Sequence, residues 1–177
     1  NDDDTAYLSR TPSVAGNRKT WTWSGWVKRG NLGTRQTIFD VDSNTTGTAG
    51  FDIEFFSDDR LYIWIEDGTY FSVPTSSRVF RDTSSWYHIV IQMDTAQATA
   101  SNRTKVYVNG EAEVIGFAYS TTYVPQNADL FVNDARQHNF GLRQRASTTF
   151  DLPFDAYLSE VNFIDGQALT PDSFGET

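Results

Sequence analysis

Apolar and polar residues alternate along most of this chain, and that spacing is the strongest constraint on its fold. Every second residue is apolar from Phe51 to Phe55 and again from Leu61 to Ile65. Side chains two residues apart lie on one face of a strand, so each segment buries one face and exposes the other. The shared register predicts a core that contains Ile53, Phe55, Leu61, Ile63, Ile89, Ile91, Val106, Val108, Leu158 and Val161.

Turn signals separate the alternating segments. Asp67-Gly68 and Asn109-Gly110 are typical of tight turns between strands, and Thr170-Pro171 predicts a short helical turn near the end of the chain. The remaining segments predict strands at 20–28, 70–73, 86–93, 105–108, 112–115 and 156–164, and loops at 42–50, 95–102 and 144–149.

Short strands with frequent turns and no crossover helices favour an all-β fold. We predict a two-sheet antiparallel jelly-roll sandwich in which residues 1–177 form a single domain. The chain opens with Asn1–Asp4 and has no initiator Met. We therefore expect a domain excised from a longer protein.

The charge of the chain narrows its partners. Lys and Arg number 14 against 23 Asp and Glu, a net charge of −9, which repels phosphate backbones and anionic lipid. We expect no nucleic-acid partner and no membrane insertion, since no apolar run approaches the roughly 20 residues that span a bilayer. Cysteine is absent, which excludes disulfides, thiolate metal sites and thiol catalysis.

Four segments, Trp21–Lys28, Trp86–Val90, Lys105–Gly110 and Asp155–Val161, follow one another in the order of known family motifs. They resemble the Ser-Gly-Trp-Val-Lys strand, the Trp-Tyr-His-Ile-Val strand, the Tyr-Val-Asn-Gly hairpin and the closing strand of LamG-like, concanavalin A-like domains. The resemblance implies a sandwich of the kind generally used to bind glycans or proteins. Residues 161–171 look like the version found in tail and structural proteins of marine bacteriophages, which implies a virion or extracellular location.

Glucanases share this superfamily, and their catalytic strand has the pattern Glu-x-Asp-x-x-Glu. Asp52 and Glu54 stand two residues apart, but the third acid is missing because Phe56 and Ser57 follow. We therefore predict that the domain is not an enzyme and keep glycoside hydrolysis as a remote alternative. The two histidines, His88 and His138, are expected to be structural. Trp21, Trp23 and Trp26 are assigned mainly to the core.

Calcium is the one cofactor that the sequence favours. Hard cations bind carboxylates and loop carbonyls, and the chain opens with an acidic run. In LamG-like domains an acid at that place can share a calcium ion with the Asp that opens the last strand, which the resemblance assigns to Asp155. If the first and last strands pair, Asp3 or Asp4 would meet Asp155 in a structural site.

The ligand-binding prediction rests on aromatic residues that point away from the core. Tyr62 and Trp64 alternate with the core residues of one strand, and Tyr107 does so in another. Asp52, Glu54 and His88 supply polar groups beside them, as sugar rings require. We predict a binding module for a glycan or host-surface polysaccharide; the alternative is an assembly domain that contacts other subunits of a virion or fibre.

Overall fold

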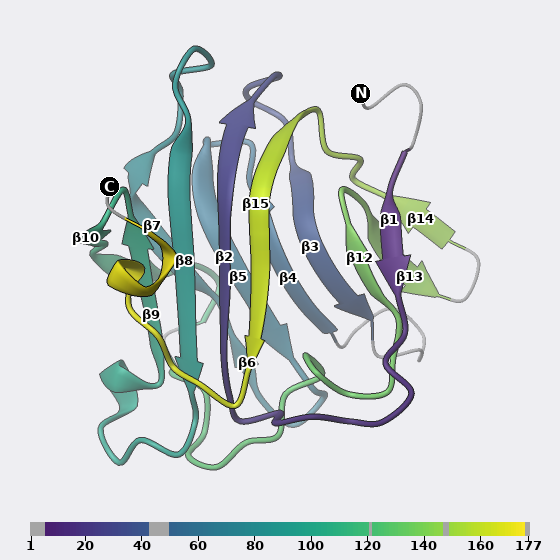
Figure 1. The fold of residues 1–177 in the computed structure, drawn as a ribbon, viewed down its shortest axis with the longest axis vertical. Helices are drawn as coiled ribbons and strands as arrows, with labels where there is room; N and C mark the ends of the chain where they lie inside the picture. Colours follow the sequence, from purple (N-terminus) through teal and green to yellow (C-terminus); the bar gives the residue numbers. More distant parts are fainter. Residues whose placement is uncertain (1–5, 43–49, 121, 147–148, 176–177) are drawn as a thin grey trace.

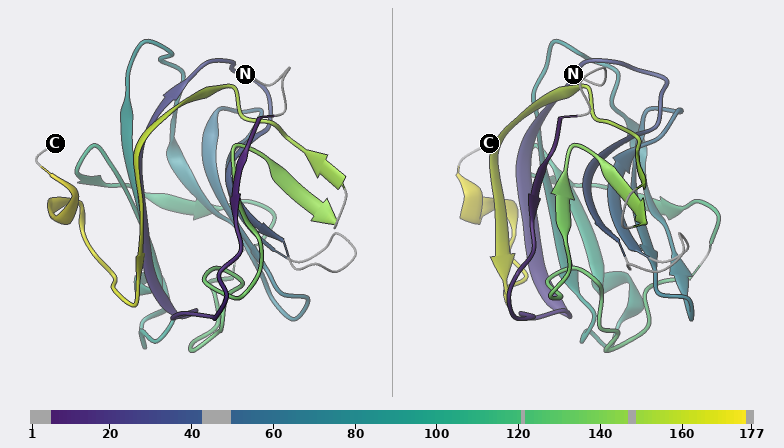
Figure 2. Two further views of the ribbon diagram at one scale, coloured as in Figure 1. Left: turned by 45° about the vertical axis from the view of Figure 1, so that its right-hand side comes forward. Right: turned by 90° about the vertical axis from the view of Figure 1, so that its right-hand side faces the viewer.

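The computed structural model describes residues 6–42, 50–120, 122–146 and 149–175. Two antiparallel sheets pack face to face (Figure 1, Figure 2). The larger sheet has the strand order β1 (Leu8–Arg10), β12 (His138–Phe140), β3 (Gln36–Asp42), β4 (Gly50–Phe55), β5 (Arg60–Glu66), β7 (Pro74–Val79) and β11 (Ile115–Phe117), with β6 (Phe71–Ser72) paired to β5.

The smaller sheet faces the viewer in Figure 1. Its strand order is β10 (Glu111–Ala112), β9 (Thr104–Val108), β8 (Tyr87–Asp94), β2 (Thr20–Arg29) and β15 (Ala156–Asp165). A separate hairpin contains β13 (Arg143–Ala146) and β14 (Thr149–Asp151), and two 3-10 turns are η2 (Ala100–Asn102) and η3 (Pro171–Phe174). The predicted two-sheet sandwich is confirmed, and none of the described helices is long and apolar enough to cross a membrane.

The core lies between the two sheets and follows the predicted register. Ile53 pairs with Ile63 on β4 and β5, and the same faces of β8 and β9 oppose them. The predicted core residues are buried except for Leu158 and Val161, which are partly buried and pack against the core from β15. A bulge in β15 between Ser159 and Asn162 brings both of them to the core side, although they are three positions apart and a regular strand would place them on opposite faces.

Three local predictions were wrong or incomplete. Residues 112–115 do not form one strand, because β10 pairs with β9 while β11 crosses to β7 in the other sheet. The predicted loop at 144–149 contains parts of β13 and β14, which Arg143 and Asp151 connect by a bidentate ion pair. Strand β7 follows β6 after only Val73, where the sequence predicted a single strand at 70–73.

A buried ion pair joins the sheets at one end of the sandwich. Arg29 of β2 donates from Nη1 to Oδ1 of Asp59, in the turn between β4 and β5, at 2.9 Å, and its guanidinium lies 4.4 Å from the ring centre of Phe55. Asp59 also accepts the Gly33 N–H and Nε of Arg81. Burial alone would raise the pKa of Asp59. The hydrogen-bond donors have the larger, opposite effect, so the pKa of Asp59 lies below its usual value.

We expect Asp59→Ala to destabilise the domain by about 3–5 kcal/mol, because it leaves the buried Arg29 without its carboxylate. Urea unfolding would measure the change. The control is Asp129→Ala, which removes an exposed partner 3.9 Å from Lys19 and is expected to cost about 0–1 kcal/mol. Equal unfolding midpoints for the two variants would contradict the role assigned to Asp59.

Candidate functional site

Four of the six residues predicted to bind a ligand lie together on the outer face of the larger sheet. Asp52 pairs with Trp64, and Glu54 pairs with Tyr62, across β4 and β5. The core residues of these strands point inward, so the pleat directs all four side chains outward. The larger sheet therefore carries two of the three predicted aromatic residues, Tyr62 and Trp64, beside the two predicted acids.

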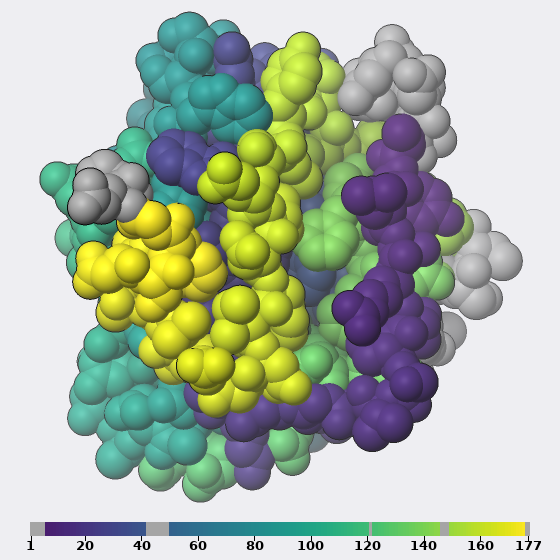
Figure 3. All heavy atoms as spheres, viewed as in Figure 1, coloured from purple at the N-terminus to yellow at the C-terminus, as the bar shows by residue number. Residues whose placement is uncertain are grey.

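His88 and Tyr107 lie on β8 and β9 of the other sheet, so the six residues do not form one site. The segment after β15 covers this face, as the yellow atoms in Figure 3 show. The ring of Phe174 lies 6.3 Å from that of His88, and Nε2 of Gln92 donates to the carbonyl of Ala168. His88 is 2% exposed, contacts Ser24 Oγ at 2.9 Å, and has a pKa lowered by burial.

Trp26 also lies on this outer face. It was expected in the core with Trp21 and Trp23, which are fully buried. Trp26 instead stacks on His88 with ring centres 4.9 Å apart. The even positions of β2 face outward, and the sequence prediction for Trp26 was wrong because aromatic character outweighed register.

The outward carboxyl of Asp52 is buried beside that of Asp40, its partner on β3. Asp40 accepts hydrogen bonds from Nδ2 of Asn139 at 2.8 Å and from the N–H of Gln144 at 3.1 Å. Burial, followed by the neighbouring charge of Asp40, raises the pKa of Asp52 well above its usual range. Burial and the neighbouring carboxylate therefore favour the protonated form of Asp52, whose partner Asp40 accepts two hydrogen bonds.

Glu54 is also shielded from solvent. It is 0% exposed, and its two carboxylate oxygens accept Nε and Nη2 of Arg35, each at 2.8 Å. Burial raises the pKa of Glu54 to about 7, against the opposing effect of Arg35. The Arg35 guanidinium lies over the rings of Phe56 and Trp64, at 4.7 and 5.3 Å from their centres. Glu54 thus fixes the position of the guanidinium that packs on Phe56 and Trp64.

Five rings form a continuous cluster, here called the aromatic platform, in which the predicted ligand residue Tyr62 is itself buried at 6% exposure. Its members are Phe56, Tyr62, Trp64, Phe71 and Tyr119. Tyr62 stacks on Phe56 at 4.6 Å, and Trp64 meets Phe71 edge-on at 4.9 Å. Tyr119 lies 5.7 Å from Trp64 and is 66% exposed. Its backbone has a φ of +60°, a conformation that few residues other than Gly adopt. The platform therefore ends in one freely accessible ring.

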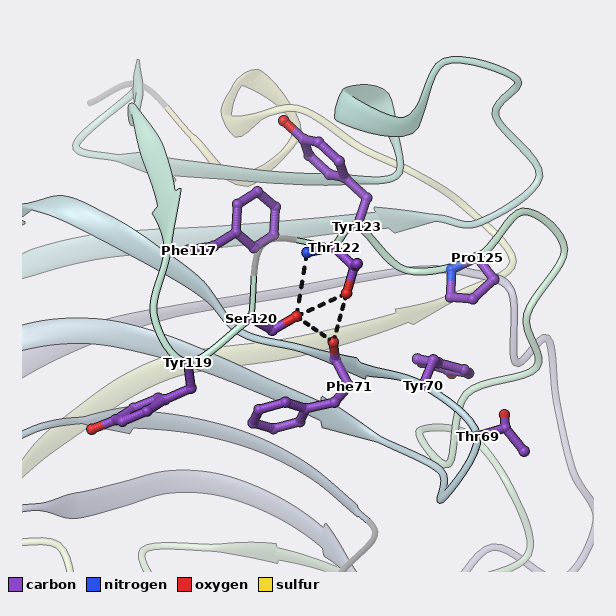
Figure 4. Close-up of a pocket in the computed structure, with 9 residues that line it drawn as sticks. All are labelled: Thr69, Tyr70, Phe71, Phe117, Tyr119, Ser120, Thr122, Tyr123 and Pro125. Carbon is purple, nitrogen blue, oxygen red and sulfur yellow. Dashed lines mark hydrogen bonds between the residues drawn. The ribbon is translucent and has the colours of Figure 1, made fainter.

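A pocket of about 790 Å³ adjoins the platform (Figure 4). Its lining comes from the turn at β6 and from the segment after β11, namely Thr69, Tyr70, Phe71, Phe117, Tyr119, Ser120, Thr122, Tyr123 and Pro125. The hydroxyls of Ser120 and Thr122 donate to the carbonyl of Phe71 at 2.6 and 2.9 Å. Rings and hydroxyls together give the composition of a saccharide site.

The sequence interpretation did not single out the pocket residues. Phe117 ends the short strand β11, and Tyr119 and Tyr123 lie in the Ser- and Thr-rich segment after it, so the register analysis, whose predicted strand stopped at 115, did not reach them. Three aromatic residues within seven positions of a polar segment were the available signal. Exposed aromatic side chains in such a segment are a better indicator of binding than those within a strand, where core packing competes.

The residues predicted to hold calcium are only partly placed. Asp155 is partly buried beside Gly30, whose N–H it accepts through its backbone carbonyl, while Asp3 and Asp4 lie outside the described residues. The expectation that the first and last strands pair was wrong, because β1 pairs with β12 and β15 pairs with β2. Within the described part of the chain, no three acidic or histidine side chains gather in a metal-binding group.

Comparisons with known proteins agree with this fold. A family model described as the concanavalin A-like lectin/glucanases superfamily matches residues 2–173. The sialidase CBM40 of Ruminococcus gnavus is similar over 96% of both chains, with 12% identity and a TM-score of 0.62. It has also been solved bound to α2,3 and α2,6 sialyllactose.

Two further solved structures are similar in fold. A heptameric SAP-like pentraxin from Limulus polyphemus has 15% identity and a TM-score of 0.64, over 94% of this chain and 72% of that one. A putative carbohydrate binding protein from Bacteroides ovatus has 17% identity and a TM-score of 0.58, over 94% and 42%. A search of curated proteins finds no match.

The buried acids predict a pH dependence of stability. The pKa values of Asp52 and Glu54 are raised in the folded state, so the folded chain binds more protons than the unfolded chain above about pH 4. The free energy of unfolding should therefore fall as pH rises through about 7. We expect Asp52→Asn to reduce this loss of stability with rising pH. The Asn amide cannot ionise, but it can donate a hydrogen bond to Asp40.

Unfolding midpoints at pH 5 and pH 8 measure the effect. Asp52→Asn should match or exceed the wild type at pH 8 and differ little from it at pH 5. The control Asp129→Asn makes the same substitution at an exposed residue and should leave the pH dependence unchanged. A loss of stability in Asp52→Asn that is larger at pH 8 than at pH 5 would refute the protonated state of Asp52.

Proposed function

We propose that this chain, which belongs to the concanavalin A-like lectin/glucanases superfamily, is a non-catalytic module that binds carbohydrate. The ligand would lie against the aromatic platform and enter the adjoining pocket. The observation that carries this proposal is Tyr119, an exposed ring that connects Trp64 to a pocket lined by hydroxyls. Sugar rings stack their C–H faces on such rings and form hydrogen bonds through their hydroxyls.

The names of the structural neighbours support a carbohydrate ligand. They include a CBM40 module crystallised with sialyllactose and a putative carbohydrate binding protein. Because identity to these structures is below 20%, they support the fold and the general class of ligand. The position of the site is argued from the residues of this chain.

The burial of both candidate acids supports a role without catalysis. Glycoside hydrolysis requires two carboxyl groups that reach the scissile bond from opposite sides, about 5 Å apart or more. Asp52 is buried against Asp40, and Glu54 has both oxygens engaged by Arg35. In our proposal these acids position the aromatic residues and do not contact the ligand.

The setting that we propose is a phage structural protein or a similar adhesin, on a virion or outside the cell. Its support is the resemblance of residues 161–171 to phage tail proteins and the acidic charge of the chain. A short glycan offers few contacts, so each site would bind weakly. Many copies on one fibre would raise the overall affinity through effective concentration.

We expect Tyr119→Asn to weaken glycan binding about tenfold or more, because it removes the exposed stacking ring. Asn tolerates the positive φ of this position better than Ala does. The matched control is Tyr157→Asn, which removes a tyrosine that is also 66% exposed but lies on β15. The measurement is a glycan array probed with the domain fused to a multimerising scaffold, with released sugars assayed in parallel.

If the multimeric domain binds no glycan and no host-cell envelope, the glycan proposal fails and the assembly role stands in its place. Equal losses of glycan binding in Tyr119→Asn and Tyr157→Asn would show that the aromatic platform is not part of the binding site. Sugar release that Glu54→Gln abolishes would contradict the absence of catalysis.

We also retain a structural calcium ion with Asp155 as a proposed ligand. An ion that binds only the folded state raises the melting temperature in step with ln(1 + [Ca²⁺]/Kd). We expect millimolar calcium to raise the melting temperature relative to EDTA, and Asp155→Asn to abolish the rise. Identical melts in EDTA and calcium would contradict the proposal.

A further inference from the structure

Two hydroxyls of the pocket, those of Ser120 and Thr122, already donate hydrogen bonds within the protein. Ser120 Oγ and Thr122 Oγ1 lie 2.8 Å apart, and each lies within 2.9 Å of the Phe71 carbonyl (Figure 4). Each hydroxyl has one hydrogen, and in the structure both hydroxyls donate to the Phe71 carbonyl, while the N–H of Thr122 donates to Ser120 Oγ at 3.2 Å. In this arrangement the remaining lone pairs of the two oxygens are available as hydrogen-bond acceptors.

Acidic side chains border the same surface. Oδ1 of Asp67 accepts the N–H and the hydroxyl of Thr69 and the N–H of Tyr70. Glu66 lies 3.5 Å from the indole N–H of Trp64. None of the nine described residues that line the pocket is charged. Asp67 and Glu66 thus place negative charge beside the pocket without lining it.

The arginines beside the platform are paired with carboxylates. Arg35, whose guanidinium lies over the Trp64 ring, gives two hydrogen bonds to Glu54 at 2.8 Å. Arg60 lies 3.9 Å from Asp58, which also accepts the hydroxyl of Tyr62. An incoming anion would have to compete with an acid that each arginine already contacts.

Two further arginines bind backbone carbonyls of the segment that follows the pocket hydroxyls. Arg18 donates to the carbonyl of Leu130 at 2.6 Å and lies 3.6 Å from Asp134. Arg103 donates from Nη1 to the carbonyl of Val124, and its Nε and Nη2 bind two other backbone carbonyls. Neither arginine lines the pocket, so neither offers a carboxylate-bearing sugar a fixed counter-charge.

Resting on the carbohydrate-binding function proposed above, we infer that the pocket selects an uncharged saccharide unit and discriminates against sialylated and other anionic sugars. A neutral sugar presents hydroxyl donors to the acceptor oxygens of Ser120 and Thr122. A carboxylate brings only acceptors and meets the negative potential of Glu66 and Asp67. The inferred preference for neutral sugars differs from that of the CBM40 module, which has been solved with the sialylated sugar sialyllactose bound.

The test is an array of matched glycan pairs that differ only in an anionic group, with lactose and its α2,3- and α2,6-sialylated forms among them. The multimerised domain is the probe. We expect neutral members to bind about tenfold more tightly than their anionic partners at low salt. The difference should narrow as salt screens the repulsion. Tyr119→Asn should lower the binding of the neutral members.

Charge variants separate the electrostatic effect from general loss of binding. Glu66→Gln should reduce the discrimination, and Glu66→Lys should reduce it further by raising the binding of the sialylated members. Glu111→Lys makes the same change of charge on an exposed residue of β10 and should leave the discrimination unchanged. An unchanged ratio in Glu66→Lys would overturn the electrostatic cause.

Preferential binding of the anionic members, lost in Tyr119→Asn, would overturn the inference while the proposed function stands. Absence of binding to every member would instead overturn the proposed function, and the inference with it. Preference for neutral members that Tyr119→Asn leaves intact would place the selectivity outside this pocket and overturn the inference as well.

Discussion

Two sheets can bury their apolar faces only against each other, and this constraint organises the whole domain. Because Ile53 and Ile63 occupy the space between the sheets, the pleat sends Glu54 and Tyr62 to the opposite side. A shift of one residue would exchange the two sets and expose the core. The position of the aromatic platform is therefore fixed by residues that never contact it.

The outer face of the larger sheet shows how buried acids can serve a binding surface indirectly. Glu54 accepts two hydrogen bonds from Arg35, and the flat guanidinium of Arg35 packs on the rings of Phe56 and Trp64. Burial and the charge of Asp40 raise the pKa of Asp52, which favours its uncharged form in a region with several acids. Arginine suits this position because its planar group binds a carboxylate and stacks on aromatic rings at the same time.

The sequence predicted the strands whose two faces differ in polarity, and it predicted less where that difference is absent. Strands β4, β5, β8 and β9 were found from alternation, whereas β7 begins with Pro74 and two of its residues are serines. Register also predicts which side chains point into the core and which point away from it, but it does not predict in which sheet a residue lies. For that reason His88 was grouped with Trp64, although the chain after β15 covers it. Tyr119 lies outside any strand, so alternation does not apply to it.

The bulge at Glu160 matters beyond the packing of Leu158 and Val161. Strand β15 is the last in its sheet, and a straight strand of ten residues there would offer a long row of unpaired backbone groups to another chain. The left-handed backbone of Glu160, with a φ of +49°, interrupts that row halfway along and places a carboxylate at the break. Copies of the domain held close together can thus remain separate folded units and avoid merging into a shared sheet.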